Sequence, residues 1–220
     1  IGGFTVVLIP EVSENFYTKN FTALRKDVST AVTFSTLVTA IFLPLFAVLG
    51  DEIGLFVYGD YTCGKFLSMS SPIMITMSLS MITTTILNSI GEERKTLLYF
   101  LISSSVLLLS ACFLPKYLGV YSLIVGYALN YLLSSVLNVI LINKKSKQSP
   151  KYLLTSLTIL ACVLPTVAFG YFLKKLLLRI VGSLITTIID SLAIVLFITL
   201  IIAATKPVGV KAILKSIKHK

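Results

Sequence analysis

Apolar residues run almost without interruption through six stretches of the chain, each long enough to cross a lipid bilayer. A membrane-spanning helix needs about 20 mostly apolar residues, at a rise of about 1.5 Å per residue. Inside the hydrocarbon no water can bond to the backbone, so such runs must be helical. The pattern predicts an all-α polytopic transmembrane bundle with spans near residues 28–49, 66–90, 97–114, 117–142, 152–173 and 180–204.

Composition agrees with a membrane protein and leaves little material for catalysis. Apolar residues make up 56% of the chain and charged residues only 13%, about half the share in soluble domains; the mean hydropathy is +0.95. Cys63, Cys112 and Cys162 are isolated in the sequence, which is typical of packing residues rather than of disulfides or CxxC metal sites. His219 is the only histidine. No cofactor, no metal site and no enzymatic activity are expected.

The chain begins without a methionine, inside an apolar stretch (residues 1–9) that is too short to span a membrane. No charged region precedes this stretch and no small-residue cleavage site follows it, so it does not resemble a signal peptide. We expect it to be the end of a helix whose beginning lies upstream. On this interpretation the chain is a C-terminal fragment.

The net charge of +10 is explained by membrane topology rather than by nucleic-acid binding, because no basic stripe interleaved with aromatic residues is present. The loops at 10–27, 91–95, 143–151 and 205–220 hold fourteen of the lysines and arginines, and the alternate loops hold five. Cytoplasmic loops carry the excess of positive charge. The count predicts a cytoplasmic C-terminus.

Two basic segments leave alternatives open. Lys174, Lys175 and Arg179 lie in a loop predicted to be outside, where they either contact an anionic headgroup or snorkel from helix ends. The tail, residues 206–220, has apolar residues on one helical face and lysines on the other. It is either an amphipathic helix on an anionic inner leaflet or a simple stop-transfer tail.

Polar residues inside the predicted spans are the candidates for function. Asp190 is the only carboxylate deep in a span, and an intramembrane acid is a functional hypothesis by default. It is either a cation or proton site, or a protonated acid bonded to Ser or Thr. The span at 66–90 is rich in Ser and Thr and includes Thr84 and Asn88; Asn130 lies in the span at 117–142. These side chains either pack helices together or line a hydrated cavity.

Three prolines inside spans are candidate hinges: Pro44, Pro72 and Pro165. Proline removes a backbone hydrogen bond from a helix, and interrupted helices recur in transporters. Proline is also common in membrane helices that do not move, so this indication is weak.

Five short segments, taken in order, resemble the C-terminal half of the multidrug/oligosaccharidyl-lipid/polysaccharide (MOP, MATE-like) flippases and cover about residues 4–143. No single segment is specific, but their order and spacing are. Ser122 and Leu123 depart from the usual small pair of alanines. The segments are Leu8–Glu14 (LIPEVSE, similar to the LPxxSE signature), Phe42–Pro44, Ile53–Gly59, Ile86–Gly91 before the charged residues 92–95, and Leu118–Tyr127.

The resemblance implies a division of the chain into three parts. Residues 1–143 would form the second lobe of a two-lobe transporter, with its first helix truncated, and residues 206–220 a basic cytoplasmic tail. Residues 144–205 would add two transmembrane helices, as in the branch that holds the stage V sporulation protein B type and the MurJ-type lipid II flippases. The residues that bind diphosphate in such proteins belong largely to the first lobe, so no substrate-binding residue is carried over.

The function that the resemblance implies is translocation of undecaprenyl-linked oligosaccharide or lipid II-type precursors for cell-wall, spore-cortex or surface polysaccharide synthesis. The expected partners are a polyprenyl-diphosphate-linked sugar, the lipid bilayer and the N-terminal lobe of the same protein, without nucleic acid. A lysine-rich, tryptophan-free composition suits the plasma membrane of a Gram-positive bacterium. The alternatives are a cation-coupled multidrug exporter and, less favoured, a membrane-embedded transferase.

Overall fold

The computed structural model describes residues 2–146, 151–177 and 183–205. This part of the chain is helical except for short connections and contains no strand, which confirms the all-α prediction. Its helices are α1 (Gly2–Tyr17), α2 (Phe21–Tyr58), α3 (Tyr61–Ser70), α4 (Ile73–Ser89), α5 (Glu93–Phe113), α6 (Pro115–Leu118), the 3₁₀ turn η1 (Gly119–Tyr121), α7 (Ser122–Ser146), α8 (Lys151–Ala161), α9 (Val163–Leu177) and α10 (Ser183–Thr205).

Among the described residues, five helical segments are long and apolar enough to cross a membrane. They are α2, α5, residues 115–146, residues 153–176 and residues 186–204. The pair α3–α4 makes a sixth if it counts as one bent span. These segments coincide with the six apolar runs of the sequence, so the polytopic membrane architecture is confirmed.

The first connection is much shorter than the predicted loop at residues 10–27. Helix α1 continues to Tyr17 and α2 begins at Phe21, which leaves a turn of three residues. The side chain of Asn20 caps α2 by accepting a hydrogen bond from the backbone N–H of Ala23 at 3.2 Å. The charged residues in this region do not interrupt the helices, because Val12 and Leu24 give both of them a buried apolar face.

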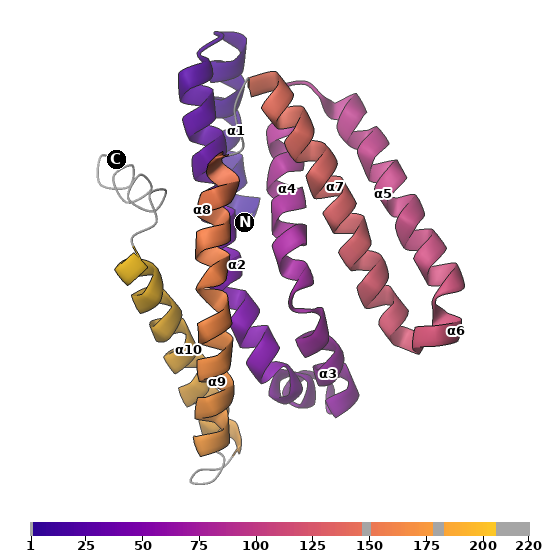
Figure 1. Cartoon of the computed structure of the whole chain (residues 1–220), viewed down its shortest axis with the longest axis vertical. Coiled ribbons are helices and arrows are strands. Elements are labelled where there is room, and N and C mark those ends of the chain that lie inside the picture. The colour runs from indigo at the N-terminus through magenta and orange to yellow at the C-terminus, as the bar shows by residue number, and fades with distance from the viewer. Residues whose placement is uncertain (1, 147–150, 178–182, 206–220) are drawn as a thin grey trace.

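Helix α2 occupies the centre of the molecule (Figure 1). Helices α1 and α4 pack on its first half and α8, α9 and α10 on one side, while α3 packs on its last turns. Helices α5 and α7 pack on each other, and α7 joins them to the rest through α4. At 38 residues α2 is roughly 57 Å long, which exceeds the hydrocarbon thickness of about 30 Å.

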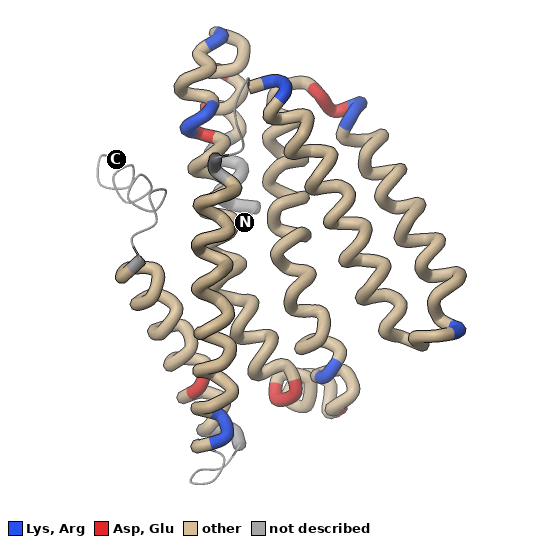
Figure 2. The backbone as a smooth tube through the Cα atoms, viewed as in Figure 1, with Lys and Arg blue, Asp and Glu red and all other residues tan. Residues whose placement is uncertain are grey.

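Charged residues gather at the two ends of the bundle and are sparse between them (Figure 2). We call the end with the α1–α2 and α4–α5 connections the upper end, and the end with α3 and α6 the lower end, as drawn in Figure 1. The predicted loops at 10–27, 91–95 and 143–151 reach the upper end wherever they are described. Arg179 and the predicted tail at 206–220 lie outside the described residues.

The apolar core is divided along α2. Near the upper end, Leu24 and Val28 of α2 pack with residues of α1, α4 and α7 such as Leu87 and Ile142. Further down, Ala40 and Leu43 pack with residues of α8, α9 and α10. One helix therefore holds together two groups of helices that touch each other little.

Helices α2 and α3 cross at three glycines. Gly50 and Gly54, one turn apart on α2, face Gly64 of α3. A Cβ atom built on Gly54 would lie 2.2 Å from the Cα and backbone N atoms of Gly64, and one on Gly64 would lie 2.6 Å from the Cα of Asp51. Small residues spaced by four let membrane helices approach this closely. Because of this close crossing, the chain reverses its direction sharply between α2 and α3 at the lower end.

We predict that Gly54→Val separates α2 from α3 and destabilises the protein. Overpacking of a close contact costs about 1–3 kcal/mol. Here the valine would clash with backbone atoms of Gly64, which cannot move aside by changing a side-chain rotamer. Thermal unfolding in detergent, followed by circular dichroism, should show a lower midpoint. The control is Ser105→Val, which places the same side chain at an exposed position of α5. Equal midpoints for the two variants would contradict this account.

Candidate functional site

The span at 66–90 is broken where it meets Pro72. Helices α3 and α4 are bent by 58° at this break. Proline has no N–H to donate to the carbonyl four residues earlier. On either side of it the backbone forms hydrogen bonds that span three residues instead of four: Ser71 N to Ser68 O at 3.3 Å and Met74 N to Ser71 O at 3.1 Å. Pro72 itself is exposed. The predicted hinge position is therefore a real discontinuity of the helix.

The other two prolines have different surroundings. Pro44 is buried within α2, which continues through it. Pro165 is exposed near the start of α9, and the chain leaves α-helical geometry three residues earlier, at Cys162. The ring of a proline clashes with the carbonyl of the residue four positions before it, here Ala161, which explains the break between α8 and α9.

Two cavities adjoin the break between α3 and α4. One, of about 800 Å³, lies between the last turns of α2, helix α3 and residues 118–121. The other, of about 490 Å³, lies between α3, α4 and the first turns of α7. Both are bordered by Phe66 and Ser70. Their lining is mostly apolar and aromatic, and the ring of Phe66 stacks on that of Tyr121 at 6.5 Å.

The upper half of the same span is used for packing. The Ser80 hydroxyl donates to Ser134 at 2.9 Å, and Asn138 of α7 donates to Thr84 at 2.8 Å. Asn88 accepts a hydrogen bond from Thr96 of α5 at 2.7 Å. Polar side chains that bond across helices join them inside the membrane. Helix packing therefore accounts for Thr84 and Asn88, whereas the cavities beside α3 have a mostly apolar lining in which Ser70 is the polar residue of this span common to both.

Asn130 is buried in α7, with 7% of its surface exposed. It lies about two turns before Asn138 on the same helix and so on a similar face. Asn130 does not line either of the two cavities beside α3. Its placement matches helix packing.

A cluster of charged residues lies toward the lower end, where α9 and α10 pack on α2. The Nζ atom of Lys174 lies 2.7 and 2.9 Å from the two carboxylate oxygens of Glu52 and 2.9 Å from the backbone oxygen of Val48. The Tyr171 hydroxyl, one turn earlier, donates to the backbone oxygen of Ala47 at 2.7 Å. Helix α9 is therefore bonded to two successive carbonyls of α2.

Asp190 of α10 belongs to the same region. Its side chain is fully buried, and neither carboxyl oxygen has a hydrogen-bond partner among the described residues. The charges of Lys174 and Glu52 both act on it. The helices come this close because Gly170 has no side chain: a Cβ there would lie 2.9 Å from Val48 and 3.0 Å from Ile194.

The predicted basic residues of this region are separated by the fold. The side chain of Lys174 is only 16% exposed and turns toward Glu52, whereas Lys175 is exposed. Sequence reasoning did not pair Asp190 with a base and did not select Glu52. Lys174 and Glu52 are 122 positions apart, and no local pattern links them. The spacing of Gly50 and Gly54, however, could have indicated a close helix crossing beside Glu52.

The upper end has its own ion pairs. Glu92, between α4 and α5, pairs with Lys95 at 2.7 Å and with Lys145 at the end of α7. The hydrogen bond from Lys145, followed by that from Lys95, lowers the pKa of Glu92 below its ordinary value of 4.5. Arg25 of α2 donates to the backbone oxygen of Ser146 at 3.2 Å. These contacts hold the end of α7 against its neighbours.

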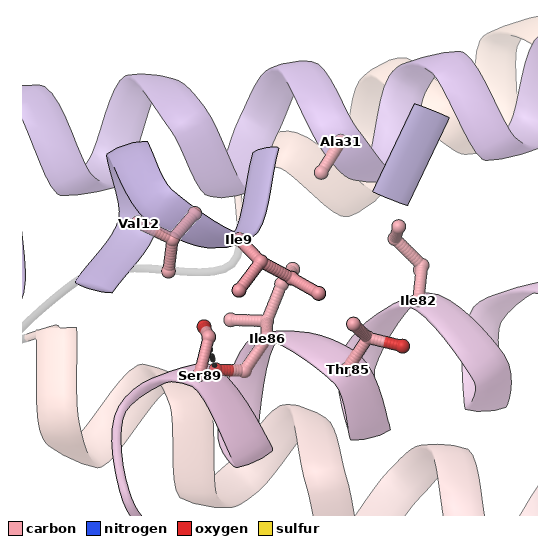
Figure 3. A pocket seen from close by; sticks show the side chains of 7 residues that line it. All are labelled: Ile9, Val12, Ala31, Ile82, Thr85, Ile86 and Ser89. Atoms are coloured by element: carbon pink, nitrogen blue, oxygen red, sulfur yellow. Dashed lines mark hydrogen bonds between the residues drawn. The ribbon is translucent and has the colours of Figure 1, made fainter. Parts of the chain in front are cut away.

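A third cavity is too small to bind a ligand (Figure 3). It lies between α1, α2 and α4 and measures about 10 Å³, which is about the least space that can hold one water molecule. Its lining is nearly all apolar, with Ile9, Val12 and Ile86 pointing toward one another. The hydroxyl of Ser89 at its edge is bonded to the backbone oxygen of Ile86 at 2.8 Å.

In the described part of the chain, no group of three or more His, Cys, Asp or Glu side chains is placed to hold a metal ion. No family model, no curated protein and no solved structure matches the chain.

We predict that Glu92 makes stability depend on pH at the acidic end. Because its pKa is lowered in the folded protein, its contribution is present above pH 4.5 and is lost as the pH falls below that value. Glu92→Gln should lower the free energy of unfolding at neutral pH by about 1 kcal/mol or less, the range for ion pairs near a surface. Thermal unfolding as a function of pH measures the difference.

The matched control is Glu93→Gln, which changes the exposed neighbour of Glu92. It should leave the unfolding midpoint near that of the unmodified protein at every pH. A Glu92→Gln midpoint that stays equally far below the unmodified protein at neutral and acidic pH would show that the ion pairs are not the cause.

Proposed function

We propose that this chain is the second lobe of a membrane flippase that translocates polyprenyl-diphosphate-linked sugars across the plasma membrane of a Gram-positive bacterium. The substrates would be undecaprenyl-linked oligosaccharides or lipid II-type precursors for cell-wall, spore-cortex or surface polysaccharide synthesis. The C-terminus and the upper end of the bundle would face the cytoplasm. The N-terminal lobe of the same protein would complete the transport path.

The observation that carries the proposal is the break between α3 and α4 beside two cavities. Interrupted backbone at membrane depth is tolerated where it lies inside protein or beside a cavity, and transporters place such broken helices at their binding sites. Ser70, the last residue of α3, borders both cavities. A helix that bends at this point can change the shape of both cavities as it moves.

The chemistry of the cavity wall supports a substrate with a long apolar part. Phe66, Tyr121 and Tyr127 are among its lining residues, and they offer apolar surface to an isoprenoid chain. Two exposed lysines, Lys65 of α3 and Lys116 of α6, belong to the helices around the larger cavity. Their charges suit a diphosphate, whose passage through bare hydrocarbon would be very costly.

A cation-coupled multidrug exporter is the second candidate. A cavity of about 800 Å³ lies within the range of about 300–1,000 Å³ for sites that bind drug-sized molecules. Aromatic faces such as that of Tyr121 also attract organic cations. The two functions differ in the charge of the substrate, so one assay can separate them.

We predict that the complete protein, reconstituted in liposomes, moves a fluorescent polyprenyl-diphosphate sugar between leaflets faster than protein-free liposomes do. A membrane-impermeant reductant that bleaches only the outer leaflet measures the movement. Ser70→Trp fills the cavities and should slow it by roughly tenfold or more, which equals about 1.4 kcal/mol in the barrier. The matched control is Ser105→Trp on α5, which is exposed and away from both cavities.

Movement no faster than in protein-free liposomes would reject the flippase proposal. If the same liposomes instead export cationic dyes in exchange for protons or sodium ions, the second candidate is correct. Equal rates for the unmodified protein and for Ser70→Trp would show that the substrate does not use the cavities beside α3.

A further inference from the structure

Among the described residues, the charged cluster at the lower end holds two acids and one base. Glu52 lies on α2, Lys174 on α9 and Asp190 on α10, so each group comes from a different helix. If both acids were ionised, the cluster would carry one negative charge in excess. A charge without a counter-charge is expensive at membrane depth. One bound proton makes the cluster neutral.

The contacts indicate where the proton resides in this structure. All three N–H groups of Lys174 have acceptors within reach, namely the two carboxylate oxygens of Glu52 and the carbonyl of Val48. Glu52 therefore contacts Lys174 through both of its carboxylate oxygens. Asp190 is fully buried and no described residue donates a hydrogen bond to it, an environment in which a carboxyl group keeps its proton.

We propose that Glu52, Lys174 and Asp190 form a proton-binding site in which the two acids share one proton and Lys174 pairs with the acid that is ionised. In one state Asp190 is protonated and Lys174 pairs with Glu52. In the other state Glu52 is protonated and Lys174 pairs with Asp190. The proton leaves one carboxyl group and binds to the other, and the net charge of the cluster is zero in both states.

The two acids differ in their access to water. The side chain of Glu52 is 22% exposed and lies near the end of α2, whereas Asp190 is fully buried. Glu52 can therefore exchange its proton with water at the lower end, and Asp190 holds it inside the membrane. The transfer also moves the ion pair from the α2–α9 interface to the α9–α10 interface. Transfer of the proton between the two acids thereby changes which helices are bonded together.

Few other groups can take part. Helices α2 and α9 pack against α10 and bring Glu52 and Lys174 toward Asp190. In the described part of the chain, Lys175 is exposed and the Tyr171 hydroxyl is bonded to the Ala47 carbonyl. The inference concerns proton binding and does not depend on which substrate is carried.

Infrared spectroscopy of the complete protein in lipid membranes tests the proposal directly, because a protonated carboxyl group has a carbonyl band that a carboxylate lacks. Aspartate labelled with ¹³C at its carboxyl carbon shifts the band of Asp190 and leaves those of glutamates in place. At neutral pH we expect a label-sensitive band that Asp190→Asn removes. The label identifies a protonated aspartate even if that variant does not fold.

Two further variants test the sharing of the proton. Glu52→Gln frees Lys174 to pair with Asp190, so the label-sensitive band should disappear at neutral pH. Lys174→Met removes the base, so both acids should be protonated and a second, label-insensitive band should appear. Glu93→Gln, at the upper end, is the control and should change neither band.

Three results would overturn the proposal. The first is the absence of a label-sensitive band at neutral pH, which would mean that Asp190 is ionised. The second is a band that persists unchanged in Glu52→Gln, which would mean that Glu52 does not share the proton. The third is a band lost equally in Glu93→Gln, which would remove the link to the cluster. Each result is independent of whether the protein moves polyprenyl-diphosphate sugars.

Discussion

The backbone carbonyls of Ala47 and Val48 are the point on which the lower half of the structure depends. Ser68 of α3 donates to the first at 2.6 Å, Tyr171 of α9 donates to it at 2.7 Å, and Lys174 donates to the second at 2.9 Å. Hydrogen-bond donors are scarce in a membrane, so these bonds determine where the donor helices pack. They fix α3 and α9 on opposite sides of one turn of α2.

This arrangement gives α2 two roles. Its apolar residues form the core with both groups of helices, and its lower end brings together the glycine crossing, the larger cavity and the charged cluster. The crossing at Gly54 and Gly64 leaves no room for adjustment, whereas the bend at Pro72 follows directly on α3. The lower end thus combines a close backbone contact between α2 and α3 with a sharp bend between α3 and α4.

The apolar runs of the sequence determined the fold class and the approximate span boundaries, because a bilayer accepts only helices with satisfied backbone groups. The prolines gave the breaks before α4 and α9 for the same local reason, the missing N–H. The loop at 10–27 was the least accurate prediction. Its charged residues look like a connection in the sequence, but they lie on helices whose other face is buried.

The sequence by itself thus determined that this protein lies in a lipid bilayer, where its helices run, and that Asp190 is isolated in an apolar run. Only the tertiary structure decided what surrounds that acid. Lys174 and Glu52 are neighbours because Gly170 of α9 lets this helix approach Val48 of α2 closely. Such pairings depend on contacts between helices far apart in the chain, and local hydrophobic patterns carry no information about them.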